Sequence, residues 1–148
     1  MTAEQPSGKG RIVVGFDGAD SSTDALAWAV RQAVLTGSAL EVMMTWEWPS
    51  SYGWSVPIPD DFDPESDVRK VLEAAIAGIL AEHPDLNLEP RLVNEHPAPA
   101  LVEASKGADL LVVGSRGHGE FVGMLIGSVS EYCVTNAHCP VLVHRAPG

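Results

Sequence analysis

Two kinds of hydrophobic pattern alternate along this chain. Short, almost continuous apolar runs, beginning with Ile12-Val13-Val14, are typical of strands buried on both faces of a parallel sheet. Between these runs, apolar residues recur every three or four positions, as they do on one face of a helix. The clearest such stripe lies before Pro84 and leaves Lys70 and Glu73 on its opposite face. Its apolar members are Val68, Val71, Leu72, Ala75, Ile76, Ile79 and Leu80.

The pattern predicts strands and helices in strict alternation. We expect strands at 11–16, 39–46, 88–95, 108–113 and 140–144, and later helices at 99–105 and 128–136. The first helix follows the capping candidates Asp20, Ser21 and Ser22 and ends at Thr36, since Gly37 suits the left-handed position after a helix. Alternation with short connections implies parallel strands, right-handed crossovers and helices on both faces. The fold class is therefore α/β, a doubly wound three-layer sandwich.

One long connection, 47–66, departs from this regularity. It holds Trp48, Tyr52 and Trp54 together with prolines and acidic residues. Connections of this length are uncommon unless they bind something or stay irregular. We interpret it as a proline-stiffened surface loop whose tryptophans fold back on the core, with a lid or partner-binding loop as the alternative.

Composition narrows the class of protein. The 148 residues, at 15.7 kDa, suit one domain at 11–146 after a flexible segment at 1–10. We expect a cytoplasmic protein, because no apolar run approaches the ~18 residues of a membrane span and the first residues are polar. The net charge of −11 disfavours nucleic-acid partners. Cys133 and Cys139 lack the spacing of a redox pair or a zinc site, and we expect two buried thiols.

A glycine-rich stretch carries the strongest chemical signal. Gly114 and Gly117 follow the apolar run at 110–113, and Gly127-Ser128 opens the segment expected to be the last helix. Glycine lets a backbone approach a ligand closely, and the amides of a helix N-terminus attract an anion. The stretch lacks the lysine of a Walker loop and the glycine spacing of a dinucleotide fingerprint. The pattern indicates a phosphate site of another kind.

The spacing of these glycines and the following serine resembles the ATP-binding motif of the universal stress protein family. The resemblance extends over about 10–145 and includes the opening strand through Asp17, the strand end near Trp46 and the closing segment 139–143. Ala19 departs from it, since the family often has serine there. The resemblance implies the strand order 3-2-1-4-5 of an adenine nucleotide alpha hydrolase-like fold. Asp17 and Gly114 would then face each other across the crevice where strand order reverses.

The resemblance also implies roles for particular residues. Backbone groups of Gly15, Phe16 and Trp46 would hold adenine and ribose, and Asp17 would contact the adenosine portion or a phosphate-bound metal. The remaining residues would bind phosphate: Gly114, Arg116, Gly117, Gly127, Ser128 and the amides of Val129 and Ser130. Each has a structural alternative. Asp17 suits a turn that caps the first helix, the glycines suit turn geometry, Ser128 suits an N-cap, and Arg116 suits an exposed loop.

We expect the ligand to be Mg-ATP, because a triphosphate entering a chain of charge −11 needs screening and Mg²⁺ commonly bridges phosphate oxygens. The metal would be held mainly by the nucleotide. The sequence shows no dedicated pair for hydrolysis beside Arg116, which favours a nucleotide-dependent regulator of stress response, at most a weak ATPase.

Two alternatives stay open. The same fold and loop suit a cyclic AMP sensor, because a cyclic monophosphate carries fewer charges. A pyrophosphatase-type enzyme is a weaker match, since the segment 16–21 keeps only part of the Ser-Gly-Gly-x-Asp-Ser motif. As for partners, we expect a homodimer through the strand at Pro140–His144, because an apolar sheet edge invites pairing with another copy.

Overall fold

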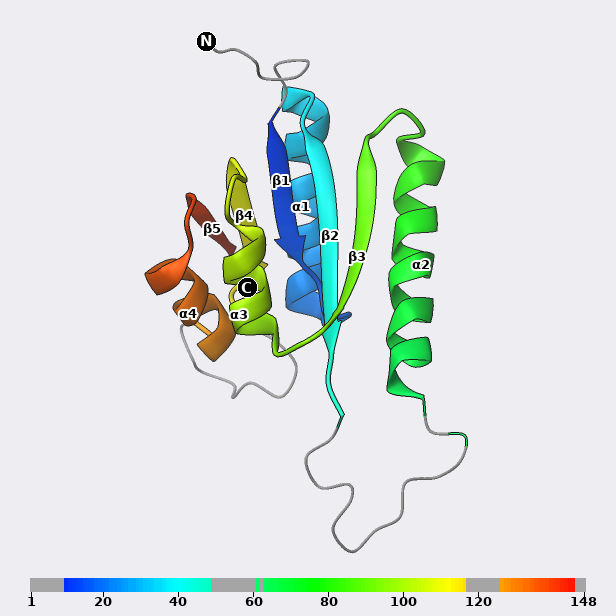
Figure 1. Cartoon of the computed structure of the whole chain (residues 1–148). Helices are drawn as coiled ribbons and strands as arrows, with labels where there is room; N and C mark the ends of the chain where they lie inside the picture. Colours follow the sequence, from blue (N-terminus) through cyan, green and yellow to red (C-terminus); the bar gives the residue numbers. More distant parts are fainter. Residues whose placement is uncertain (1–9, 49–60, 62, 117–125, 146–148) are drawn as a thin grey trace, which may run out of the picture.

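Five parallel strands form one sheet in the order β3-β2-β1-β4-β5, as Figure 1 shows. The computed structural model describes residues 10–48, 61, 63–116 and 126–145. The elements in chain order are β1 (Arg11–Gly15), α1 (Asp20–Thr36), β2 (Ala39–Trp46), α2 (Pro64–Glu82), β3 (Leu88–Asn94), α3 (Pro97–Ala104), β4 (Leu110–Gly114), α4 (Ser128–Asn136) and β5 (Val141–His144). This arrangement confirms the predicted fold class and strand order.

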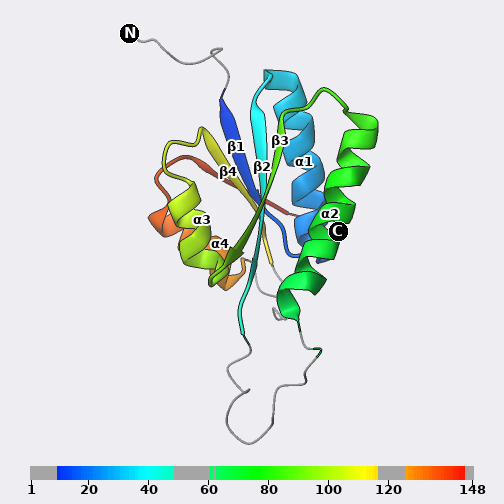
Figure 2. The same ribbon diagram turned by 45° about the vertical axis from the view of Figure 1, so that its right-hand side comes forward.

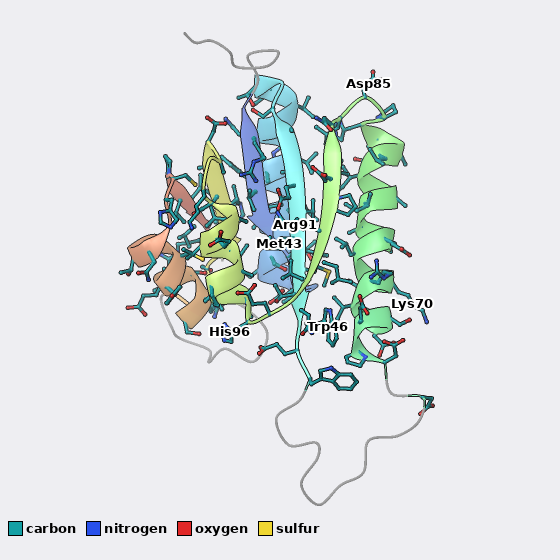
Figure 3. All side chains as sticks on the ribbon, viewed as in Figure 1. Met43, Trp46, Lys70, Asp85, Arg91 and His96 are labelled. Atoms are coloured by element: carbon teal, nitrogen blue, oxygen red, sulfur yellow. The ribbon has the colours of Figure 1, made fainter. Side chains whose placement is uncertain are left out.

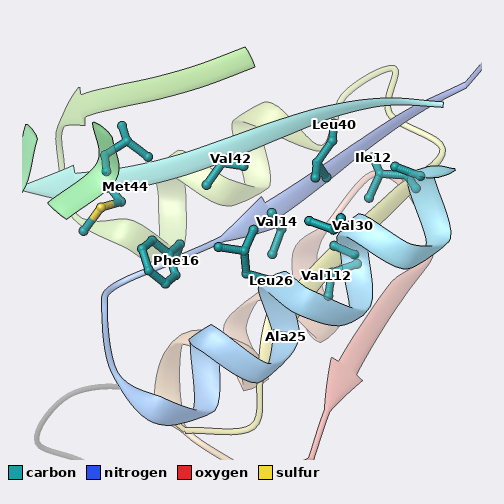
Figure 4. Packing of buried hydrophobic residues seen from close by; sticks show 13 residues of the cluster. Ile12, Val14, Phe16, Ala25, Leu26, Val30, Leu40, Val42, Met44 and Val112 are labelled. Atoms are coloured by element: carbon teal, nitrogen blue, oxygen red, sulfur yellow. The ribbon is translucent and has the colours of Figure 1, made fainter. Parts of the chain in front are cut away.

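Helices cover both faces of the sheet, α1 and α2 on one and α3 and α4 on the other (Figure 2). Successive residues of the central strands therefore enter two different cores. Val14 and Val42 lie in the core under α1 and α2, which Figure 4 shows from close by, whereas Val13 and Met43 lie in the core under α3 and α4. Burial on both faces explains why the strands are continuous apolar runs rather than alternating ones.

Helix α4 has its predicted bounds, but the caps at the starts of α1 and α4 differ from the predicted ones. Gly37 follows α1 with φ of 70°, as predicted for a left-handed cap. At the other end the N-cap is Ala19, so the capping candidates Asp20, Ser21 and Ser22 were wrong. Ser128 was also wrong as an N-cap, because Gly127 takes that position. In both helices the turn before the helix sets the first residue, and a side chain suited to capping lies inside the helix instead.

The second and third helices depart from their predicted patterns in smaller ways. Within the predicted stripe of α2 only Leu72 is buried, and Val71 is 44% exposed. The helix crosses the outer strands β2 and β3, so its stripe meets the margin of the sheet rather than its centre. Helix α3 starts at Pro97, two residues before the predicted Pro99, with His96 as N-cap accepting from Ala98 N at 3.2 Å.

One acidic residue lies inside the sheet. Glu41 of β2 is 4% exposed, and its carboxylate accepts from Arg11 Nη1 at 2.9 Å and Arg91 Nη1 at 3.0 Å. The three residues belong to three neighbouring strands, and Figure 3 labels Arg91 on β3. Pairing at both carboxylate oxygens offsets the desolvation of a buried charge. The network ties β1, β2 and β3 together.

The remaining structural expectations have mixed outcomes. Cys133 is buried as predicted, but Cys139 is only half-buried, because it precedes the edge strand. Trp48 turns back onto Trp46 with ring centroids 5.9 Å apart and stays 50% exposed. Tyr52, Trp54 and the segment 1–9 lie outside the described residues. Across the described part of the chain, no helix has the length and apolar character to cross a membrane.

Candidate functional site

The described residues line an open cavity of about 110 Å³ at the carboxyl ends of β1, β2 and β4. This is the edge where strand order reverses between β1 and β4, and ligands of doubly wound sheets bind there. In Figure 3 it lies at the end of the sheet where Trp46 and His96 are labelled. The residues that line it are Gly15, Phe16, Asp17, Ser22, Met43, Thr45, Pro97, Leu101, Val113, Gly114, Arg116, Val129 and Ser130.

The β1 side of the cavity is a tight turn that holds Asp17. Gly18 has φ of +84°, a conformation that favours glycine and reverses the chain after the aspartate. As a result, Ala19 N donates to Asp17 Oδ1 at 2.9 Å, and the Ser22 hydroxyl donates to the same oxygen at 2.7 Å. Asp17 N in turn donates to Ser22 Oγ at 3.1 Å. The carboxylate is therefore fixed at the cavity wall although its side chain is exposed.

The β4 side is a backbone segment held by several hydrogen bonds. Ser115 N donates to His144 O at 2.9 Å, and Gly127 N donates to Ser115 O at 2.5 Å. The Ser130 hydroxyl donates to Gly114 O, and Arg116 N reaches Ser21 Oγ at 3.4 Å. These contacts fix the entry of the glycine-rich loop before any ligand arrives.

Gly114 is required by close packing. A Cβ atom added there would lie 2.6 Å from Ser21 Oγ and 3.0 Å from the Ser21 backbone. The start of α1 and the end of β4 therefore approach more closely than any other residue type would allow. The sequence signal for this glycine was the loop motif, but the physical reason is a helix that packs against it.

Helix α4 supplies the anion-attracting end of the cavity. Its N-cap, Gly127, is buried and makes no side-chain cap, and Val129 and Ser130 of its first turn line the cavity. First-turn amides have no acceptor within their own helix, and the helix dipole is positive at this end. With Arg116 nearby, this end of the cavity suits a phosphate group.

The walls opposite the loop are apolar, and sequence reasoning missed most of them. Met43 and Thr45 come from β2, Val113 from β4, and Pro97 and Leu101 from α3. Leu101 lies so close to β1 that a Cβ on Gly15 would approach its Cδ1 to 3.0 Å. The alternation along β2 places Met43 and Thr45 on one face, which was a usable signal. No sequence signal placed α3 over the cavity, because its position depends on packing.

Seven of the predicted binding residues line this cavity, namely Gly15, Phe16, Asp17, Gly114, Arg116, Val129 and Ser130. Gly127 and the exposed Ser128 lie immediately before Val129, at the start of α4, and outside the lining. Trp46 also lies outside it, because successive residues of β2 face opposite sides and Thr45 takes the cavity side. Gly117 is outside the described residues, so its predicted role is untested.

Within the described lining, the charged side chains are Asp17 and Arg116, on opposite sides of the cavity. No group of three or more histidine, cysteine or acidic side chains among the described residues is arranged to hold a metal ion. Burial raises the pKa of the Cys133 thiol to about 11, and burial also raises the pKa of Cys139. Neither cysteine supplies a thiolate at neutral pH.

Comparison with known proteins agrees with this geometry. The model of the universal stress protein family matches residues 9–145. The chain belongs to the universal stress protein family. Two universal stress proteins of Mycobacterium tuberculosis are each 34% identical to it, over 140 and 147 residues, or 90% and 92% of this chain. The alignments cover 44% of each relative, so the chain spans less than half the length of these curated relatives.

Solved structures of the family share the fold. A universal stress protein from Lactobacillus plantarum superposes with a TM-score of 0.73 at 20% identity, covering 92% of this chain and 97% of that one. A universal stress protein solved in complex with cAMP has a TM-score of 0.66 at 28% identity, covering 90% of this chain and 94% of that one. The resemblance stated from the glycine spacing is thereby confirmed at the level of family and fold.

Proposed function

We propose that this universal stress protein binds an adenine nucleotide in the cavity between β1 and β4, with Mg-ATP as the ligand. The observation that carries the proposal is the cavity itself. It joins an apolar slot formed by Met43, Leu101 and Val113 to an end formed by Arg116 and the start of α4. Such a combination suits a flat base at one end and phosphates at the other. The structure solved with cAMP, which is 28% identical, supports an adenine nucleotide as the class of ligand.

The donor set fits Mg²⁺ only as a companion of the nucleotide. Asp17 is the one carboxylate among the described lining residues, and its Oδ1 already accepts two hydrogen bonds. Mg²⁺ usually keeps several waters and binds through one or two carboxylates plus substrate phosphates. Phosphate oxygens would therefore supply most of the coordination, with Arg116 and the α4 amides offsetting the remaining negative charge.

The proposed role is a nucleotide-dependent regulator of stress response with slow or no hydrolysis. Rapid hydrolysis needs a base that positions water and a group that stabilises charge on the phosphoryl oxygens. The described lining offers the Arg116 side chain and α4 amides for the second task, and Asp17 is engaged with its own turn. A homodimer through β5 and a cytoplasmic location complete the proposal.

A cyclic AMP sensor is the second candidate function. It is favoured by the cAMP complex of the 28% identical protein and by the single cationic side chain in the described lining. A cyclic monophosphate carries less negative charge than a triphosphate, so the positive charge of Arg116 neutralises a larger share of it.

Calorimetric titration of the purified, nucleotide-stripped protein with Mg-ATP, and separately with cyclic AMP, tests both functions. We expect micromolar Mg-ATP binding that is lost in the Gly117→Val, Ser128→Ala double variant, because the variant blocks the loop and removes a hydroxyl at the start of α4. Thr135→Ala, on the exposed far end of the same helix, is the matched control and should bind as the wild type does.

The other outcomes separate the alternatives. Absence of Mg-ATP binding by the wild type contradicts the main proposal, and tighter binding of cyclic AMP in that case supports the sensor. Pyrophosphate release during incubation with Mg-ATP would instead indicate a pyrophosphatase-type enzyme.

A further inference from the structure

The first turn of α1 carries two adjacent serines whose hydroxyls reach opposite sides of the cavity. Ser22 Oγ bonds to Asp17 at the end of β1, accepting from its N–H at 3.1 Å and donating to its Oδ1 at 2.7 Å. Ser21 Oγ lies 3.4 Å from Arg116 N, beyond the end of β4. Consecutive residues of one helical turn thus connect the two strands between which the cavity opens.

Ser22 is buried at 5% exposure and belongs to the cavity lining. A buried hydroxyl is costly unless it is hydrogen-bonded. This one accepts from Asp17 N and donates to Asp17 Oδ1, and Ala19 O lies at 3.1 Å as a second acceptor. Ala19 N is a second donor to the same oxygen, Asp17 Oδ1, at 2.9 Å. Because a carboxylate with two donors on one oxygen has little freedom to rotate, its other oxygen keeps a set direction.

Ser21 reaches the other side through its hydroxyl. Its Oγ lies 3.4 Å from Arg116 N, which is long for a hydrogen bond, and it packs so closely against Gly114 that a Cβ atom there would lie 2.6 Å from it. The position of α1 relative to β4 is therefore set at this residue, and with it the distance between Asp17 and the loop entry.

We infer that Ser21 and Ser22 are positioning residues of the nucleotide site, Ser22 orienting the Asp17 carboxylate and Ser21 placing the start of the phosphate loop. The inference rests on the proposed function, since both residues act through groups assigned to nucleotide binding. The two serines were first considered as helix caps. In the proposed site, Ser22 affects binding through Asp17, whereas Ser21 affects binding of the phosphates.

Binding of adenosine and of Mg-ATP to Ser21→Ala, Ser22→Ala and Thr23→Ala tests the inference. Thr23 is the matched control, because it is exposed in the same helical turn and its hydroxyl bonds to Ala19 O at 3.0 Å, away from Asp17. Loss of one ordinary protein hydrogen bond corresponds to about 2–12-fold in an equilibrium constant. We expect Ser22→Ala to weaken both ligands by that factor, and Ser21→Ala to weaken Mg-ATP while adenosine stays within about twofold.

A double-mutant cycle with Asp17→Ala separates positioning from general destabilisation. If Ser22 acts through the carboxylate, Ser22→Ala has no further effect once Asp17 is alanine, whereas the Ser21→Ala effect on Mg-ATP persists. An undiminished Ser22→Ala effect in the Asp17→Ala background overturns the role of Ser22. Equal losses of adenosine and Mg-ATP in Ser21→Ala overturn the role of Ser21.

Amide hydrogen exchange of the ligand-free protein tests the role of Ser22 without nucleotide, so its result does not depend on the proposed function. The Ala19 amide is held by the Asp17 carboxylate, so Ser22→Ala should make it exchange at least about tenfold faster, with the Thr23→Ala variant unchanged. A wild type that binds no nucleotide rejects the proposed function. The exchange of Ala19 then decides by itself whether Ser22 orients the carboxylate, and an unchanged rate rejects that role.

Discussion

At the scale of single residues, the two sides of the cavity depend on groups whose neighbours restrict them. Asp17 is exposed yet fixed by its own turn, and Gly114 is fixed because Ser21 leaves no room for a side chain. Behind the loop, Cys133 of α4 is completely buried against the sheet. Asp17 and Gly114 lie at the cavity, whereas Cys133 belongs to the core that supports it.

The buried thiol predicts a loss of stability at alkaline pH. The pKa of Cys133 rises from 9.0 to about 11 on folding, because burial disfavours the thiolate. Below pH 9 both states are protonated and the thiol has no effect. Between pH 9 and 11 the unfolded chain releases a proton that the folded chain retains, so the free energy of unfolding falls, by up to about 2–3 kcal/mol.

Urea unfolding at pH 8, 9, 10 and 11 measures this effect as the difference between wild type and Cys133→Ala. Other groups that titrate in this range cancel in the difference. We expect the gap in unfolding free energy between the two proteins to narrow as pH rises. A gap that is constant across the range would show that Cys133 ionises in the folded protein as readily as in the unfolded chain.

At the scale of elements, the residues that flank a helix decide where it begins and ends. Helix α2 begins with Asp63, whose carboxylate accepts from Ser66 N at 3.1 Å, followed by Pro64 in the first turn. Helix α1 ends at Gly37, where φ is 70°. Replacing glycine by alanine should therefore lower stability at a left-handed cap and raise it within a helix.

Two glycine substitutions test this contrast. Gly37→Ala forces a side chain into the left-handed region and should lower the free energy of unfolding by about 1 kcal/mol. Gly78→Ala, at an exposed helical position of α2 with nothing within 4 Å of the added Cβ, should raise it by about 0.5–1 kcal/mol. Thermal and urea unfolding of the two variants measure both changes. A stabilising Gly37→Ala would mean that α1 does not end in the left-handed conformation.

At the scale of the whole molecule, β5 is an edge of the sheet and is the proposed dimer interface. Leu111 N donates to Pro140 O and Ser115 N donates to His144 O, so the even-numbered residues of β5 turn their backbone groups toward β4. Val141 and Val143 then present theirs outward, where a second copy would pair. Edge pairing would join the two sheets without disturbing either site.

Proline substitutions in β5 distinguish the backbone N–H groups that face outward from those that bond to β4. Val143→Pro removes an outward N–H and should convert a dimer into a monomer, seen by light scattering coupled to gel filtration at micromolar concentration. Leu142→Pro is the matched control, because it removes an N–H that faces β4 and should lower the melting temperature more. A wild-type monomer, or a Val143→Pro variant that stays dimeric, contradicts the proposed interface.

The sequence by itself determined the α/β class, the order of elements along the chain and the place of the glycine-rich stretch after β4. These follow from local properties, since strands buried on both faces must be apolar throughout and a loop that admits close backbone approach needs glycine. Gly37 could be assigned from the chain for that reason, whereas the closest contact that requires Gly114 comes from Ser21 of α1. The strand order came from resemblance rather than from periodicity, because pairing between strands distant in sequence leaves no local pattern.

Only the tertiary structure decided which side chains meet around the cavity. The packing of α3 brought Pro97 and Leu101 over the end of β1, and the register of β2 gave Thr45 rather than Trp46 the position facing the cavity. It also turned Ser21 and Ser22 from expected caps into contacts with two different strands. A chain pattern shows which face of an element is apolar, but the neighbour that this face meets depends on how all the elements pack together.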